Sequence, residues 1–148
     1  AMEVERWAFG VMQGKVVMQK ISDDTEAYLR ASISAKPYLE CYRQLFSNPE
    51  FNVFYHAPAL LTVFAKPEGP NPACDCALAA QNIMLAAHSL GLGSCWIGFA
   101  QMSLNTPELK EQLGIPQEYI AVAPIIIGHP SKASIEIFKR EPQILFWK

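Results

Sequence analysis

The part of the chain that most constrains its fold is residues 75–100, where a long apolar helix, two glycines and a short extended segment follow one another. At about 100° per residue, the polar side chains of the helix fall within roughly 140° of arc, which leaves a wide, alanine-rich face for packing against a helix or sheet. Gly91 and Gly93 predict the end of this helix, because glycine accepts the left-handed conformation of a C-terminal cap. Residues 94–98 are then predicted to form a short strand, and Gly98 favours the close approach of another group to the backbone.

The composition is that of an ordinary globular chain. It has 148 residues, of which 51% are hydrophobic and 18% charged, and this predicts one domain over residues 1–148. The net charge of −2 provides no basic surface for nucleic acid or an anionic membrane. No apolar run reaches the ~20 residues of a membrane span, and no basic segment precedes an apolar one as in a secretion signal. We therefore expect a cytoplasmic protein with neither a nucleic-acid nor a membrane partner.

The N-terminal segment favours a hairpin followed by a helix. Residues 6–12 and 15–21 are rich in β-branched and aromatic side chains, and Gln13-Gly14 lies between them. This pattern predicts two strands joined by a tight turn. The acids and hydroxyls that begin at Ser22 can cap a helix, which we expect to run towards residue 35.

A second helix is predicted over residues 37–46, because proline is tolerated in its first turn. Residues 60–65 form a short apolar run and predict a strand, and a proline-dense loop leads from it to the central helix. Aromatic side chains recur here at spacings of three and four residues, which is more typical of a core than of a binding site: Tyr28, Tyr38, Tyr42 and Phe46.

The C-terminal half adds one more helix and one long strand. Thr106 and Pro107 predict a capped helix start, and the helix is expected to end near Gly114. Residues 119–128 form a continuous apolar run typical of a strand buried on both faces, which Pro124 is expected to interrupt with a bulge or an unpaired stretch. Helices alternating with strands predict an α+β fold of the three-layer α/β type, with helices on the faces of a sheet.

No constellation of catalytic or metal-ligating residues stands out. The four cysteines, at positions 41, 74, 76 and 95, contain no Cys-x-x-Cys pair, so we expect them to be small buried hydrophobic side chains. The glycines at 91 and 93 follow a helix, whereas a dinucleotide-binding motif needs glycines that precede one. A Cys95 thiolate near the end of a helix would be disfavoured, which argues against a nucleophilic role.

A linear pattern nevertheless runs through the second half of the chain and comprises residues 75–82, 86–98, 107–109, 113–116 and 127–130. This pattern resembles the nitroreductase family of FMN-dependent oxidoreductases, and most of all the members often fused to a ferredoxin domain. The resemblance implies a mixed sheet flanked by helices, without the N-terminal helix of the family.

The resemblance also implies a homodimer with FMN at its interface and no catalytic acid or base from the protein. The flavin would lie against Cys95, Trp96, Ile97 and Gly98, and Lys139 and Arg140 would meet its phosphate. Hydride would pass from NAD(P)H through the flavin to a nitro, quinone or similar acceptor. A ferredoxin is a further partner that the resemblance brings into consideration.

Two other functions remain open at this point. By the same resemblance, we expect this chain to start after the Arg-rich helix and the Asn-containing loop that hold FMN in the family. The loss of two or three charged hydrogen bonds, each worth ~1.5–3 kcal/mol, would weaken FMN binding by roughly 100-fold or more. The first alternative is therefore a shortened, non-catalytic relative, a dimeric module that binds flavin, another ligand or a protein. The second is a thiol or metal protein that uses Cys74, Cys76 and Cys95.

Overall fold

The computed structural model of the chain describes residues 5–131 and 141–148. Its strands are β1 (Trp7–Gln13), β2 (Ala59–Ala65), β3 (Gly93–Trp96) and β4 (Ile120–Gly128). Its helices are α1 (Lys15–Ser32), the 3₁₀ helix η1 (Pro37–Tyr42), α2 (Arg43–Phe46), α3 (Pro72–Ser89), α4 (Gly98–Ser103) and α5 (Pro107–Leu113). None of the described helices is long and apolar enough to cross a bilayer.

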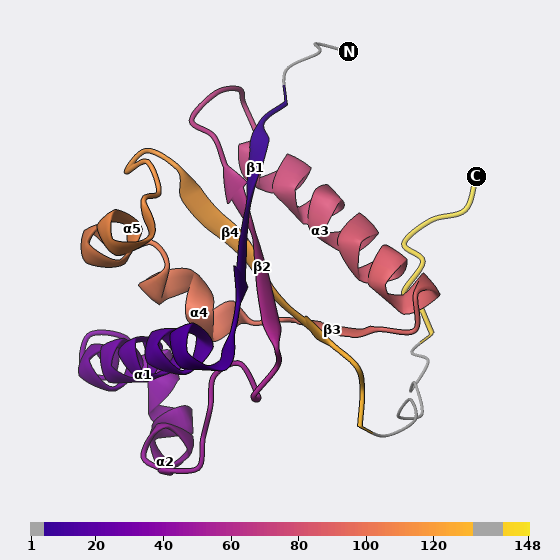
Figure 1. Cartoon of the computed structure of the whole chain (residues 1–148). Coiled ribbons are helices and arrows are strands. Elements are labelled where there is room, and N and C mark those ends of the chain that lie inside the picture. Colours follow the sequence, from indigo (N-terminus) through magenta and orange to yellow (C-terminus); the bar gives the residue numbers. More distant parts are fainter. Residues whose placement is uncertain (1–4, 132–140) are drawn as a thin grey trace.

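The described strands form one sheet in the order β1-β2-β4-β3, with β1 and β3 at its edges. Helix α3 covers one face of the sheet, and α1, α2, α4 and α5 lie on the other side (Figure 1). The fold is therefore α+β with three layers, as the sequence predicted. Each of the described strand pairs is antiparallel, so the mixed sheet that the family resemblance implied was wrong for this part of the chain.

Two apolar cores lie on opposite faces of the sheet. The larger one fills the space between the sheet and α1, α2 and α4, and includes Ile21, Leu29, Phe46, Leu60 and Leu104. The smaller one is enclosed by α3, whose small side chains Cys76 and Ala80 pack against β2 and β4. Because these side chains are short, the α3 backbone can approach the sheet closely.

Strand β4 contains a bulge, which lies against the end of α4. Val63 pairs with Ala123 but Phe64 pairs with Ala121, so Val122 is the extra residue, and the strand alternation changes there. The Asn105 side chain donates to the Ala121 carbonyl and accepts from the Ala121 amide, both at 2.9 Å. This two-way pairing fixes the end of α4 against the bulge.

Pro124 occupies a regular position in the strand opposite Thr62, and the bulge lies two residues earlier. The Pro124 carbonyl accepts from the amide of Ile97, at 2.8 Å, where the chain leaves β3. The carbonyl and the nitrogen of one strand residue point to the same side of the strand. The nitrogen of Pro124 therefore points toward Ile97 and away from β2, so its lack of a hydrogen breaks no hydrogen bond to β2. The prediction that Pro124 itself interrupts the strand was therefore wrong.

The hairpin predicted at the N-terminus was wrong in its second half, since residues 15–21 belong to helix α1. Gly14, with φ of 108°, precedes the first turn of this helix. The buried positions of α1 recur at helical spacing, but they include Ser22, Thr25 and Glu26, so the apolar pattern in the sequence is incomplete. The buried Thr25 and Ser103 hydroxyls share a 2.7 Å hydrogen bond, which satisfies polar groups inside the core.

The other predicted elements are close to those observed. Residues 37–46 are helical, although the first part is η1 and only the last turn is α2. Helix α5 is capped at its start by Thr106, whose hydroxyl accepts from the Leu109 amide, and at its end by Gly114 in the left-handed conformation. Helix α3 likewise ends just before Gly91, which has φ of 73°.

Candidate functional site

A pocket of about 450 Å³ opens where β3 passes into α4. One wall is the chain from Cys95 to Gly98, and the other walls come from η1, Tyr55 and the first turns of α4. Besides Trp96 on the first wall, four more aromatic side chains line the pocket, together with two other residues of α4 and one of η1: Tyr38, Tyr42, Tyr55, Phe99, Gln101, Met102 and Leu39. Its walls are therefore largely apolar and aromatic, which suits a flat ring.

Aromatic stacking holds η1 and α2 against α4. The ring of Phe99 meets Tyr42 at 5.0 Å and Phe46 at 5.2 Å between centroids, both edge to face. Phe46 is fully buried, whereas Tyr42 faces the pocket. The fixed geometry of such pairs keeps the aromatic wall opposite the β3 exit.

The structure brings together the residues predicted to contact the flavin ring. Cys95, Trp96, Ile97 and Gly98 all line the pocket. A side-chain carbon built at Gly98 meets nothing within 4 Å, so the protein's own atoms do not fill the space over this glycine. The Ile97 side chain is buried in the core and its amide bonds Pro124, so Ile97 contributes backbone more than side chain to this wall. Lys139 and Arg140, predicted to bind the phosphate, lie outside the described residues.

Several pocket residues were missed in the sequence. Tyr38 and Tyr42 were expected in the core, but Tyr38 is 63% and Tyr42 40% exposed, and both line the pocket. Phe46, from the same set of aromatics, is fully buried as expected. The spacing of these residues did not separate the two roles, because a short 3₁₀ helix turns its side chains differently from an α-helix.

Tyr55 enters the pocket from an unusual turn. Tyr55 and His56 have φ of 51° and 56°, so two consecutive residues with side chains adopt the left-handed conformation. The buried side chain of Asn52 accepts from the amides of Phe54 and His56, at 3.0 and 3.1 Å, and donates to Gln19. Asn52 thereby holds the turn in the conformation that places Tyr55 at the pocket wall.

The expectation of four buried cysteines was wrong for all but one. Cys76, on α3, is buried between the helix and the sheet, whereas Cys41, Cys74 and Cys95 are exposed. Burial raises the pKa of the Cys76 thiol above its ordinary value, and the nearby charge of Asp75 adds to the effect. Within residues 5–131 and 141–148, no three His, Cys, Asp or Glu side chains gather in a group that could hold a metal ion.

These exposures predict the reactivity of the thiols. In the folded protein at pH 8, Ellman's reagent is expected to modify Cys41, Cys74 and Cys95 within minutes and Cys76 only after unfolding in urea. Because the pKa of Cys76 is raised in the folded state, its contribution to stability is complete below the ordinary thiol pKa and is lost as the pH rises through the raised value. Rapid modification of four thiols in the folded protein would contradict this assignment.

The fold is of the three-layer α+β class, and its open pocket has apolar and aromatic walls. A comparison with family models then identifies the class, since residues 1–129 match the model described as "Nitroreductase family". The chain belongs to the nitroreductase family.

Individual relatives match over shorter stretches or at lower identity. The chain is 40% identical over 60 residues to an FMN reductase (NADPH) of Bacillus subtilis, a stretch that covers 40% of this chain and 23% of that protein. It is 37% identical over 60 residues to an NADPH-flavin oxidoreductase of Vibrio harveyi, covering 40% of this chain and 24% of that protein. The chain thus aligns with about a third or less of the length of such curated relatives.

Solved structures resemble the whole fold. A nitroreductase with bound FMN from Bacteroides fragilis has a TM-score of 0.80 and 25% identity, over 99% of this chain and 77% of that one. A nitroreductase with bound FMN from Desulfitobacterium hafniense has a TM-score of 0.75 and 24% identity, over 97% of this chain and 76% of that one. The second likeness concerns the fold alone.

Proposed function

We propose that this chain is an FMN-dependent oxidoreductase that takes hydride from NAD(P)H and reduces a nitro, quinone or similar acceptor. The observation that carries the proposal is the open, aromatic pocket at residues 95–98 in a chain of the nitroreductase family. The family relatives described as an FMN reductase and an NADPH-flavin oxidoreductase support it. FMN, when bound, supplies a ring that accepts hydride from the donor and passes it to the acceptor.

The residues of the pocket fit a flavin ring. The open space over Gly98 leaves room for a flat heterocycle on the main chain. The Gly98 amide is a candidate donor to the ring, whereas the Ile97 amide already bonds the Pro124 carbonyl. Tyr38, Tyr42 and Phe99 provide an apolar wall that would exclude water and orient the ring of a substrate. Lys139 and Arg140 would bind the phosphate, a role that a guanidinium suits well.

An absorbance spectrum tests the cofactor directly. The purified protein, or the protein incubated with FMN and then desalted, is expected to be yellow, to lose its colour with NADH or NADPH without oxygen, and to regain it with a nitro compound. Bound FMN should also raise the melting temperature, because a ligand that binds only the folded state stabilises it. A colourless protein whose melting temperature FMN leaves unchanged would favour the alternative of a non-catalytic, dimeric relative.

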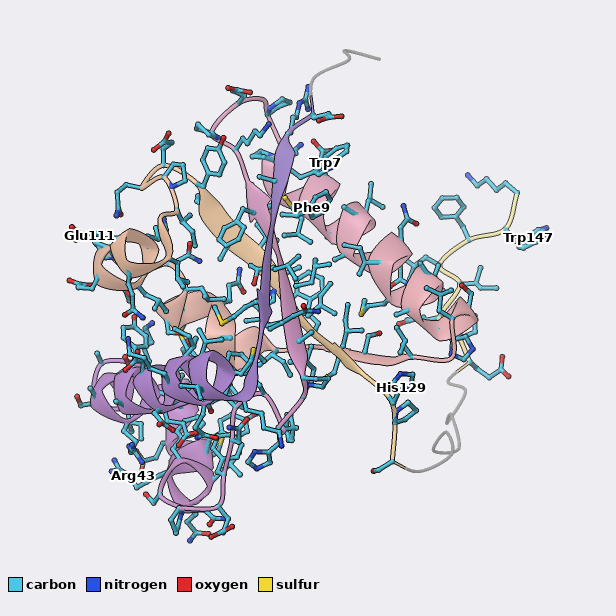
Figure 2. All side chains as sticks on the ribbon, viewed as in Figure 1. Trp7, Phe9, Arg43, Glu111, His129 and Trp147 are labelled. Atoms are coloured by element: carbon cyan, nitrogen blue, oxygen red, sulfur yellow. The ribbon has the colours of Figure 1, made fainter. Side chains whose placement is uncertain are left out.

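We further propose that the protein is a homodimer. Helix α3 buries its alanine-rich side, yet Leu78 and Leu85, two turns apart on the outer side, are 68% and 57% exposed. The chain end carries a second apolar surface over Ile144, Leu145, Phe146 and Trp147, and Trp147 is 90% exposed and lies away from the sheet (Figure 2). A second copy of the chain would cover both surfaces.

The α3 leucines allow the dimer to be tested. Replacing both Leu78 and Leu85 by lysine is expected to give a monomer by light scattering coupled to size exclusion, because two charges would have to be buried at the contact. Replacing Val16 by lysine is the matched control, since Val16 is 87% exposed on α1, on the other side of the sheet. A dimer that survives the double substitution would place the contact elsewhere.

The remaining partner and location are also proposals. Three exposed free thiols fit a reducing compartment, which supports a cytoplasmic protein. A ferredoxin partner stays a prediction of the sequence resemblance.

A further inference from the structure

We propose that Lys36 makes this pocket selective for acceptors that carry a carboxylate beside a flat ring. That the bound molecule is an electron acceptor rests on the proposed function, whereas the position of the site follows from the side chains around Met102. It adds a substrate class to the pocket and assigns a specificity-determining role to one residue.

A second hollow adjoins the aromatic pocket. This hollow, of about 460 Å³, lies between the end of α1, residue 36 and the segment from α4 to α5. Gln101 and Met102 line both the hollow and the pocket, so they form the divide between the two. A ligand whose ring lies in the pocket can therefore extend a substituent over Met102 into the hollow.

Lys36 lies at this divide, and its ammonium group can donate further hydrogen bonds. Its Nζ donates to the thioether sulfur of Met102 at 2.9 Å and lies 5.6 Å from the centroid of the Tyr28 ring. The Tyr38 hydroxyl lies on the same sulfur, at 3.4 Å. A thioether is a weak acceptor and an ammonium has three donors, so Lys36 and Tyr38 can turn together to an anionic oxygen placed above Met102.

The charge around the divide favours an anion. Lys36 is the only ionised side chain among the described residues that line the pocket or the hollow, and no Asp or Glu lines either of them. The nearby carboxylate of Glu40, on η1, forms a double hydrogen bond with Arg43 at 2.7 and 2.9 Å, which lowers the pKa of Glu40. Because this pair is self-neutralising, the positive charge of Lys36 is left uncompensated next to an apolar wall, where a ligand charge of opposite sign is attracted.

A matched pair of ligands tests the proposal. We would measure binding of 4-nitrobenzoate and of its neutral analogue 4-nitrobenzamide to the protein loaded with FMN, by calorimetry without an electron donor, and then their reduction with a donor. The unchanged protein is expected to bind the carboxylate more tightly than the amide. Lys36→Met should weaken the carboxylate by about tenfold, the value of one charge-assisted hydrogen bond, and raise its KM to a similar extent, with the amide unchanged.

Two further variants serve as controls. Lys36→Arg keeps the charge and should restore most of the preference for the carboxylate. Lys20→Met removes an exposed lysine of α1 that pairs with Asp24 and lines neither the pocket nor the hollow, and it should leave the binding of both ligands unaffected.

The outcomes separate this inference from the proposed function. Equal binding of the two ligands, or an equal loss of both in Lys36→Met, would overturn the role of Lys36 even if FMN reduction proceeds. A raised KM for NAD(P)H in Lys36→Met, with the carboxylate preference unchanged, would assign the cation to the donor's phosphates and overturn the acceptor proposal. If FMN does not bind, the proposed function fails, and calorimetry on the flavin-free protein still supports or overturns the carboxylate preference.

Discussion

A Gly98→Leu variant is expected to fold normally and to lose FMN by about 100-fold in affinity. A side chain at position 98 would project into the open space over the main chain, where no protein atom lies within 4 Å, so it would clash with the ligand and not with the protein. Overpacking of this kind is worth about 1–3 kcal/mol, and the upper end corresponds to about 100-fold in a dissociation constant.

The stability of this variant should move in the opposite direction. Gly98 begins helix α4, and replacing a helical glycine removes backbone entropy that the unfolded chain would otherwise have. The melting temperature without FMN is therefore expected to be unchanged or higher. Ala31→Leu on the exposed side of α1 is the control for added bulk, and it should leave FMN binding as it was.

Calorimetric titration of FMN into both variants provides the measurement. Weak FMN binding together with a raised or unchanged melting temperature would assign the effect to the site. Full FMN binding by Gly98→Leu would show that the ring does not lie over this glycine, and the proposed cofactor position would have to be abandoned.

The largest effect on stability is expected from Phe46→Ala. Phe46 is fully buried and contacts Phe99 and Phe51, with ring centroids at 5.2 and 6.1 Å. Truncating a buried phenylalanine costs about 3–5 kcal/mol, because apolar contacts are lost and a cavity remains. For a chain of this size the melting temperature should fall by about 10 °C.

A neighbour on the same short helix provides the control. Leu45 is 37% exposed, so Leu45→Ala is expected to cost about 1 kcal/mol or less, measured by urea unfolding. If the two substitutions had similar effects, Phe46 would not be the residue that holds α2 against α4. A further consequence is that Phe46→Ala should weaken ligands of the aromatic pocket, since Phe99 depends on Phe46 for its position.

The central part of the chain could be predicted from the sequence because local signals there agree with the final packing. Gly91 marks the end of one helix, and Thr106 marks the start of another, because each has the backbone preference that its position needs. The apolar, β-branched run after residue 119 likewise matches a buried strand. The family resemblance named residues 95–98, which are consecutive and line one pocket in the structure, and their contact with a flavin stays a prediction.

The N-terminal part could not be predicted because some of its polar side chains find hydrogen-bond partners in distant parts of the chain. Ser22 looked like the start of a helix, yet it lies inside α1, where its hydroxyl donates to Glu26 and accepts from the Val53 amide. The opposite wall of the pocket was missed for the same reason, since Tyr38 and Tyr55 come from separate segments. No pattern within either segment indicates that they face each other.

The turn that carries Tyr55 lowers the stability of the fold and at the same time places an aromatic ring at the pocket. Glycine would adopt φ near +50° with little strain, whereas a residue with a side chain destabilises the fold there by about 1 kcal/mol or more. A chain selected only for heat resistance would be expected to carry glycine at positions 55 and 56. The ring of Tyr55 lies at the pocket wall in spite of this strain, and the turn is outside the sheet, so position 55 is where we would seek an altered ligand preference by engineering.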